Sequence, residues 1–394
     1  MKKDHCALVL GGYVNGYSII QELSENQVGE IILFAYSKEL ASYSNKIKQF
    51  TIIDKTPESL YKGIERLHTQ YKKIIIFPTD DLQLENLHKI HPEISPYCFL
   101  PFNPENLHNC LDKYTQYSYC QKLGIPYPKT VYLQAKEDLE NIHTLQFPVL
   151  LKPNKREDLK RKVFRNMQLH SPEDLEKVER NLETHFNNGI KFLASEIIPG
   201  DEDCLYAYVA YRAINGKILN EWVGKKLAQY PDNFGVFSSA SNQAPEEVRI
   251  QGRKLLEGMD ITGIAQPEFK FDFRDNQYKL MEINLRSMMW HRVGNLSGVN
   301  LQYSQYLDAL GQEVNYQTQE SNKDIHFIYL KHEIINLMRR KKYFQVFMRN
   351  IRNSGETHLA VYDKKDLKPF LKDCVDIVMS VIDKVFRTRN RRIL

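Results

Sequence analysis

The sequence lacks the features that mark several large classes of protein. It has no run of eighteen apolar residues, so no transmembrane helix is expected. Its six cysteines are scattered, without a C-x-x-C pair or metal-ligand spacing, which favours reduced thiols in a cytoplasmic protein. The apolar run at residues 7–10 is too short for the core of a signal peptide. Internal repeats are absent, and basic and aromatic residues are not interleaved as in nucleic-acid-binding proteins.

What is present is the composition of an ordinary globular protein. The chain is 394 residues long, 42% hydrophobic and 26% charged, which suffices for two or three domains with apolar cores. The net charge of +5 is uneven, because residues 331–394 hold sixteen Lys/Arg and seven Asp/Glu. That segment is therefore +9 and the rest of the chain is −4. The basic character belongs to the C-terminal segment.

The N-terminal hundred residues alternate between strands and helices. Strands are expected at residues 7–10, 31–35, 50–53 and 73–77, with helices at 17–23 and 57–70. This alternation predicts a parallel sheet with ligand crevices at the carboxyl ends of its strands. Gly11, Gly12 and Gly16 have the spacing G-G-x3-G rather than G-x-G-x-x-G, so a nicotinamide site is poorly supported. The glycine turn and the loop at residues 79–81 could line a small-molecule pocket or simply serve the fold.

The most informative stretch is an expected hairpin at residues 264–272 and 278–286. Side chains at alternate positions of a strand share one face, so Glu282, Asn284 and Arg286 point the same way. Pairing of the two strands brings Glu268 alongside Glu282. Two carboxylates and an amide oxygen suit Mg²⁺, and an arginine beside them suits a phosphoryl group. The alternative is a solvated polar face, but the other face is expected to be buried through Leu280, Met281, Ile283 and Leu285.

Several segments before this hairpin carry further signals. A helix is expected from residue 104 to 123, and a short buried strand at 147–153 ends near Lys152, a costly place for a charge unless an anion meets it. A basic loop at 154–162, either solvated or lying over phosphates, leads to strands at 163–169 and 192–196 with a helix at 171–187 between them. An acidic turn to residue 203 follows, then a hairpin across Asn215-Gly216 and a helix at 246–259.

In this order, these segments resemble the ATP-grasp superfamily, in particular its carboxylate–amine ligases, over residues 1 to 310. The Glu-Ile-Asn-x-Arg pattern is similar to that of the D-aspartate ligases and of ligases in bacterial surface-polymer synthesis. The resemblance implies that Lys113 and Lys152 bind phosphates. It also implies that Glu268, Glu282 and Asn284 hold two Mg²⁺ ions, with Mn²⁺ as an alternative, and that Arg286 steadies the acyl phosphate.

The same resemblance implies a nucleotide hinge. Glu196 and the backbone of Ile197 and Ile198 would read the adenine edge, and Asp203 would bind the ribose hydroxyls. One departure is that the loop after Lys152 has no glycine, so a side-chain cation must cover the phosphates: Lys155, Arg156 or Lys162. Another is that Leu285 stands where many relatives have proline. Lys225 and Lys226 are carboxylate or phosphate contacts or, equally well, surface lysines.

The implied architecture is α/β with four parts. These are an N-terminal parallel-sheet domain (1–105), a small ATP-grasp lobe with a linker helix (106–190), a large lobe with the metal site (191–312) and a basic, mostly helical C-terminal extension (313–394). In the extension, helices are expected within residues 332–351 and at 371–387, with a strand at 358–362. These helices are expected to pack on the domain. Residues 387–392 could instead meet the inner face of an anionic membrane.

The expected function is that of an ATP-dependent, ADP-releasing ligase. It would activate a substrate carboxylate as an acyl phosphate and join it to an amine, with Arg286 and Lys152 as the catalytic residues. Its substrates would be small molecules such as amino acids, uronic acids or sugar-linked compounds, in peptide or cell-surface polymer synthesis, and no nucleic acid is expected. The alternatives are a non-catalytic nucleotide- or sugar-binding module that keeps the fold and, more remotely, a nicotinamide-dependent dehydrogenase.

Overall fold

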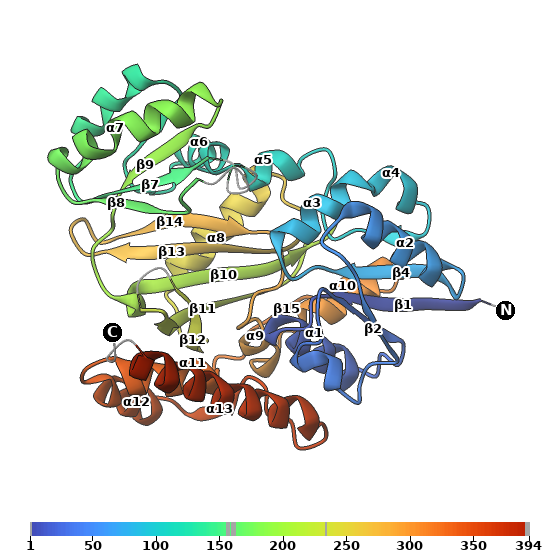
Figure 1. Cartoon of the computed structure of the whole chain (residues 1–394). Coiled ribbons are helices and arrows are strands. Elements are labelled where there is room, and N and C mark those ends of the chain that lie inside the picture. The colour runs from blue at the N-terminus through green and yellow to red at the C-terminus, as the bar shows by residue number, and fades with distance from the viewer. Residues whose placement is uncertain (1, 155–157, 159–162, 233–234, 391–394) are drawn as a thin grey trace.

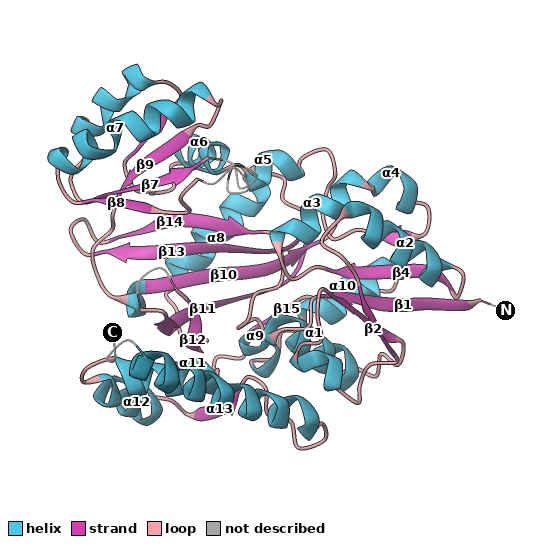
Figure 2. Ribbon diagram, in the orientation of Figure 1, coloured by secondary structure: helices cyan, strands magenta, loops and turns pink. Residues whose placement is uncertain are grey.

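Three sheets organise the chain in the computed structural model, which describes residues 2–154, 158, 163–232 and 235–390. Figure 1 shows a parallel-sheet domain at the N-terminus, a large sheet in the middle, a small lobe that ends in α7, and a layer of C-terminal helices. Figure 2 shows the same arrangement by type of secondary structure. Within the described residues, no helix combines the length and the apolar character needed to cross a membrane.

The N-terminal sheet is parallel, as predicted. Its five strands follow the order β3-β2-β1-β4-β5 and are β1 (Lys3–Leu10), β2 (Ile31–Ala35), β3 (Gln49–Ile52), β4 (Tyr71–Phe77) and β5 (Cys98–Phe99). The helices around them are α1 (Val14–Glu25), η1 (Leu40–Tyr43), α2 (Pro57–His68), α3 (Asp81–Lys89) and α4 (His91–Ile94). Strand β2 is buried along its whole length, as expected where helices cover both faces of a parallel sheet.

The small lobe is a four-stranded antiparallel sheet reached through two linker helices. Its order is β6-β9-β7-β8, and its strands are β6 (Thr130–Leu133), β7 (Val149–Pro153), β8 (Met167–Leu169) and β9 (Phe192–Glu196). Its other elements are α5 (Leu107–Leu111), α6 (Lys113–Leu123), η2 (Lys136–Thr144) and α7 (Pro172–Asn187). The expected strand at 163–169 is wrong in its first half, since β8 begins only at Met167.

The single helix predicted from residue 104 to 123 is also wrong. Asp112 has extended backbone angles and separates α5 from α6. Its side chain accepts a hydrogen bond from the Thr115 backbone N–H at 2.7 Å, so it serves as the N-cap of α6. This cap puts Lys113 on the first residue of α6, next to the cavity described below.

The large sheet has eight strands in the order β14-β13-β10-β11-β12-β16-β17, with β15 beside β11. The strands are β10 (Leu205–Arg212), β11 (Ile218–Tyr230), β12 (Val236–Ser241), β13 (Gly263–Asp272), β14 (Gln277–Asn284), β15 (Gln317–Thr318), β16 (Ile325–Ile328) and β17 (Glu356–Leu359). The helices between them are η4 (Glu202–Cys204), α8 (Glu246–Gly258), α9 (Arg292–Leu296) and α10 (Leu301–Ala309). Strand β11 runs six residues beyond the predicted end at Gly224.

The C-terminal segment adds both strands and helices to this sheet. Strands β16 and β17 continue it beyond β12, and the helices are α11 (Leu330–Arg339), α12 (Tyr343–Arg352) and α13 (Leu367–Asn390). Lys342 adopts a left-handed backbone (φ 62°) between α11 and α12, which ends one helix and lets the chain turn into the next. The boundary predicted at residue 312 stays a prediction, as do the other domain limits.

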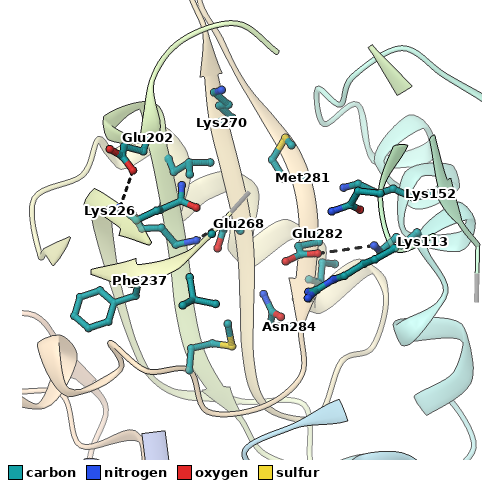
Figure 3. A pocket seen from close by; sticks show the side chains of 18 of the residues that line it. Lys113, Lys152, Glu202, Lys226, Phe237, Glu268, Lys270, Met281, Glu282 and Asn284 are labelled. Atoms are coloured by element: carbon teal, nitrogen blue, oxygen red, sulfur yellow. Dashed lines mark hydrogen bonds and ion pairs between the residues drawn. The ribbon is translucent and has the colours of Figure 1, made fainter. Parts of the chain in front are cut away.

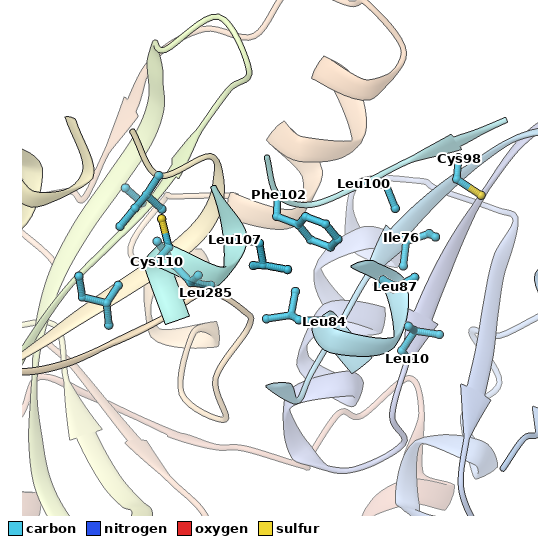
Figure 4. Packing of buried hydrophobic residues seen from close by; sticks show 14 of the residues in the cluster. Leu10, Ile76, Leu84, Leu87, Cys98, Leu100, Phe102, Leu107, Cys110 and Leu285 are labelled. Atoms are coloured by element: carbon cyan, nitrogen blue, oxygen red, sulfur yellow. The ribbon is translucent and has the colours of Figure 1, made fainter. Parts of the chain in front are cut away.

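One apolar cluster joins the N-terminal domain to the large sheet (Figure 4). It runs from Leu10 and Ile76 of the parallel sheet through Leu84 of α3 to Leu285, which directly follows β14. These side chains are buried, so their packing fixes the end of β14 against α3. The residues on either side of Leu285 are thereby held at the junction of the two domains.

Candidate active site

A large cavity, of about 1370 Å³, lies where the three sheets meet. Figure 3 shows side chains from the large sheet and the small lobe pointing into it. The structure brings together eight of the predicted site residues along its wall: Lys113, Lys152, Ile197, Ile198, Glu268, Glu282, Asn284 and Arg286. Glu196 and Asp203 are not among the described residues that line it. Lys155, Arg156 and Lys162 lie outside the described residues.

The predicted pairing of the two strands of the hairpin is confirmed. Glu268 of β13 is directly opposite Glu282 of β14, and Gln266 is opposite Asn284. Directly opposed residues of an antiparallel pair have side chains about 5 Å apart at Cβ. The two carboxylates and the Asn284 amide therefore share one small patch of the cavity wall, as Figure 3 shows.

Met281 differs from its prediction, because it lines the cavity instead of packing on the buried face. The register of β13 and β14 shifts after Glu268, whose neighbour Phe269 pairs with Leu280. Met281 is thus the extra residue of a β-bulge, and it faces the cavity together with Glu282. Leu280 and Ile283 remain in the core on the other side. The bulge places an apolar side chain beside the carboxylates.

Each oxygen of the Glu268 carboxylate is held by a donor from the protein. Lys226 Nζ lies 2.7 Å from Glu268 Oε1, and Gln266 Nε2 donates to Glu268 Oε2 at 3.2 Å. The Lys226 and Glu268 side chains are only 8% and 10% exposed. A buried pair of this kind requires close contact to offset desolvation. Lys225, the other lysine considered from the sequence, lies over the Tyr206 ring instead.

Glu282 is surrounded by cations. Lys113 Nζ lies 4.0 Å from Glu282 Oε2. Burial raises the pKa of the Glu282 carboxyl, but nearby cations, the Lys113 ammonium first among them, outweigh burial and hold the pKa at about 2. The other three cations belong to Lys152, Lys226 and Arg286. Glu282 is therefore ionised at neutral pH and available as an oxygen ligand.

The surroundings of Lys152 disfavour its charged form. Burial, followed by the neighbouring Lys113 ammonium, lowers its pKa to about 8 against the opposing effect of Glu282. The side chain extends from β7 toward the large sheet (Figure 3). A buried cation crowded by another cation is stabilised by any anion that enters the cavity. The expectation that Lys152 needs an anionic partner agrees with this environment.

Arg286 forms an ion pair with the N-terminal domain. Its Nε and Nη2 donate to the two carboxylate oxygens of Asp81, at 2.5 and 3.3 Å. Asp81 is the first residue of α3, so the loop at residues 79–81 reaches the active site, as considered from the sequence. Burial lowers the pKa of the Arg286 guanidinium. Packing of Leu285 in the apolar cluster and this fork-like pair together set the position of the guanidinium.

The hydrogen bonds of the predicted hinge differ from those expected. The Ile197 N–H donates to Pro148 O at 3.1 Å, while Lys270 Nζ donates to the backbone oxygens of Ile198 and Gly200, at 2.9 and 2.6 Å. Glu196 Oε1 accepts a hydrogen bond from the Gln146 backbone N–H at 2.9 Å. The side chain of Glu196 thus organises the small lobe.

Of the acidic residues in the turn, Asp201 and Glu202 line the cavity and Asp203 does not; Glu202 has contacts to two other lining residues. It accepts the Gln229 backbone N–H at 2.7 Å and is ion-paired with Arg340, which also lines the cavity. Asp203 instead lies 3.6 Å from the Arg349 guanidinium. Arg340 directly follows α11 and Arg349 is in α12, so the C-terminal segment reaches the hinge, which no spacing in the sequence could indicate.

Gln266 is a further residue of the site that sequence reasoning missed. A signal for it existed, since it lies two positions before Glu268 on the same strand and therefore shares its face. His291 contacts the site through its hydrogen bond to Gln266, and no pattern in the sequence indicated it.

The oxygen ligands present suit a cation that arrives with phosphates. In the part of the chain that the structure describes, no group of three or more His, Cys, Asp or Glu forms a metal site. Glu268, Glu282 and Asn284 provide two carboxylates and one amide. Mg²⁺ is commonly bound by one or two carboxylates together with substrate phosphates, whereas a Ca²⁺ site needs six to eight oxygens.

Comparisons with known proteins agree on the fold. No family model matches the chain. It is 27% identical over 339 residues to the D-aspartate ligase of Enterococcus faecium (strain Aus0004), covering 80% of each chain. The N5-carboxyaminoimidazole synthetase of Staphylococcus aureus complexed with ADP aligns with a TM-score of 0.65, at 15% identity over 87% of each chain. The L-amino acid ligase of Bacillus licheniformis aligns with a TM-score of 0.58, at 15% identity over 80% of this chain and 77% of that one. The predicted fold class is confirmed.

The low pKa of Lys152 predicts its reactivity in the nucleotide-free protein. Only the neutral amine is acylated, and a lysine with a pKa of about 8 is roughly one-tenth neutral at pH 7. The acylation rate at Lys152 should rise about tenfold from pH 6 to 7 and level off above pH 9, as measured by peptide mass spectrometry. Lys136 is the control, because its hydrogen bond to Glu183 raises its pKa and its labelling should still rise at pH 10. A rate at Lys152 that climbs without a plateau would contradict the assignment.

Proposed function

We propose that this chain is an ATP-grasp carboxylate–amine ligase: it activates a small-molecule carboxylate with ATP, joins it to an amine and releases ADP, as its likeness to the D-aspartate ligase of Enterococcus faecium supports. The observation that carries this proposal is the facing pair Glu268 and Glu282, enclosed by cations from separate parts of the fold. Those cations are Lys113 of α6, Lys152 of β7, Lys226 of β11 and Arg286 after β14.

The charges of this site fit phosphoryl transfer to a carboxylate. A carboxylate must approach the terminal phosphate of a polyanion, and the main barrier to that approach is electrostatic. Four cations against three carboxylates, with Asp81 counted for its pair with Arg286, leave this part of the cavity wall positive where phosphates would lie. Lys113, Lys152 and Arg286 would hold the phosphates in line, and the acyl phosphate formed on the substrate would then be attacked by the amine.

Glu268, Glu282 and the Asn284 oxygen would hold Mg²⁺, with Glu282 shared between two ions. When bound, the metal supplies charge neutralisation and orientation of the phosphate oxygens. The chain's own contribution is to hold the Glu268 carboxylate in place and to keep Glu282 ionised. Lys226 holds one oxygen of Glu268, while the cations around Glu282 keep its pKa at about 2.

The hinge and the bulge together would receive the nucleoside. Ile198 and Met281 supply apolar surface on the cavity wall, which suits a purine ring, and Lys270 fixes the backbone between Ile198 and Gly200. Glu202 lies at the same end of the cavity and would accept the ribose hydroxyls. This assignment shifts the ribose contact by one residue from the Asp203 predicted by sequence.

The substrates would bind at the opposite end, against the N-terminal domain. Tyr13 and Asn15 line the cavity there together with Asp81 and with Met288 and Met289 from the segment after Arg286. Polar and charged groups beside apolar ones suit a small zwitterionic molecule, so amino acids are the first carboxylates we propose. Peptide or cell-surface polymer synthesis remains the proposed setting.

Peripheral contact with a membrane stays a prediction. The exposed face of α13 carries apolar side chains between Leu367 and Met379, and the surrounding C-terminal segment is basic. Residues 391–394, which belong to the basic terminus named above, lie outside the described part of the chain.

A phosphate-release screen tests the proposed function. The protein, MgATP and matched pairs of carboxylates and amines are incubated, and inorganic phosphate is measured against reactions that lack one partner. Release that requires both partners, with the amide found by mass spectrometry, supports the ligase. ATP binding by calorimetry, without release for any amino acid or uronic acid pair, would instead favour the non-catalytic binding module.

Glu282→Gln should lower carboxylate-dependent ADP formation by at least about a hundredfold, the scale for losing one electrostatic contact in a transition state. The amide keeps the size of the side chain but removes the charge that two metal ions would share. Glu257→Gln is the control, since Glu257 is exposed on α8. Near-normal ADP formation by a folded Glu282→Gln protein would refute the metal assignment.

Glu202→Gln and Asp203→Asn distinguish the two ribose assignments. Loss of a hydrogen bond to a charged acceptor costs about 1.5–3 kcal/mol, so Glu202→Gln should raise the KM for ATP about tenfold or more with little change in kcat. Asp203→Asn should change the KM less than about twofold, because its partner is Arg349 outside the cavity wall. The reverse ranking would restore Asp203 as the ribose ligand.

A further inference from the structure

A line of three buried polar side chains runs behind the candidate metal site. His291 Nε2 and Gln266 Oε1 are 2.8 Å apart, and Gln266 Nε2 is 3.2 Å from Glu268 Oε2. Gln266 is fully buried, and His291 and Glu268 are 1% and 7% exposed. We call His291, Gln266 and Glu268 the relay. Its first two members have no part in the function proposed above.

The donor and acceptor atoms of the three side chains determine the direction of both hydrogen bonds in the relay. The Gln266 oxygen can only accept, so His291 Nε2 must carry the proton and donate. A flipped Gln266 amide would set its oxygen against the Glu268 carboxylate, two acceptors facing each other, and would lose the hydrogen bond to Glu268. His291 Nδ1 has no partner among the described residues, and burial lowers the pKa of this histidine to about 3. The imidazole is thus a neutral donor at its Nε2 atom.

We propose that His291 is a positioning residue for the metal site: by donating to Gln266 it keeps the amide N–H group on Glu268 and so fixes the carboxylate for a divalent cation. This inference rests on the proposed function, in which Glu268 is a metal ligand.

The contacts of Glu268 show why a second donor matters. Lys226 holds Oε1 at 2.7 Å. Without the donor on Oε2, the lysine alone would set the rotation of the carboxylate and draw it toward the ammonium. With one donor on each oxygen, one lone pair per oxygen remains for a cation. Gln266 also lies directly opposite Asn284, so the relay borders two of the three predicted ligands.

The test measures metal binding directly, without turnover. Mn²⁺ is titrated in the presence of excess non-hydrolysable ATP analogue, and free Mn²⁺ is counted by electron paramagnetic resonance. His291→Leu should weaken Mn²⁺ binding about tenfold or more, the usual range for losing an outer-shell partner. His291→Gln, whose amide can place an N–H near the Nε2 position, should recover most of the affinity.

His326→Leu is the matched control. His326 of β16 is likewise fully buried, and neither ring nitrogen has a partner among the described residues. Its replacement makes the same chemical change in another part of the large sheet and should leave Mn²⁺ affinity unchanged. Thermal unfolding is measured for every variant, so that a loss of fold is not mistaken for a loss of metal binding.

A double variant tests whether His291 acts through Gln266. Gln266→Leu should weaken Mn²⁺ binding about as much as His291→Leu, and the double variant should lose little more, because residues acting in series are not additive. If His291→Leu does not fold, the pair Gln266→Leu and His291→Gln decides: strong loss in the first with near-normal binding in the second supports the relay.

Three results would overturn the proposal. Equal Mn²⁺ affinity in folded His291→Leu and wild type would remove the relay but keep Glu268 as a ligand. Equal losses in His291→Leu and His326→Leu would show a general effect of buried histidines. Absence of nucleotide-dependent Mn²⁺ binding by the wild type would overturn the metal assignment of the proposed function, and the relay with it.

Discussion

The site depends on the cost of placing two carboxylates face to face on the wall of one cavity. Glu268 and Glu282 are opposed in one antiparallel pair, and like charges at such positions repel. The repulsion is offset only because separate segments bring cations to the same point, among them Lys113 from the linker and Lys226 from the neighbouring part of the sheet. The acidic pair is therefore stable only in the assembled fold, which couples the formation of the active site to the docking of the small lobe on the large sheet.

The N-terminal domain takes part in this assembly through Arg286. Apolar packing around Leu285 fixes the backbone, and Asp81 fixes the guanidinium. An arginine held by a carboxylate on one side can present its remaining N–H groups to an anion without a large loss of side-chain entropy, as in other preorganised sites. A domain that resembles a nucleotide-binding fold from its glycine turn thus serves here to orient a residue of the neighbouring sheet.

Local rules account for much of what the sequence predicts. The period of two along a strand places Glu282, Asn284 and Arg286 together, and strand pairing supplies Glu268. The same rule fails at Met281, because one bulged residue turns its side chain to the cavity. Strand β12 escaped prediction because its sequence Val-Phe-Ser-Ser-Ala-Ser lacks apolar alternation; its buried Ser238 hydroxyl donates to Glu333. Contacts between distant segments, such as Arg340 with Glu202, have no period to reveal them.

The C-terminal segment adds structure that contacts the cavity from outside the two lobes. Strands β16 and β17 extend the large sheet, and α11 and α12 carry Arg340 and Arg349 to the acidic turn. Each arginine engages a different carboxylate of that turn, Glu202 or Asp203. The Arg349 pair engages Asp203, which is not on the cavity wall, while Glu202 is on it. Under the proposed function, these helices would therefore influence which of the two adjacent carboxylates meets the ribose.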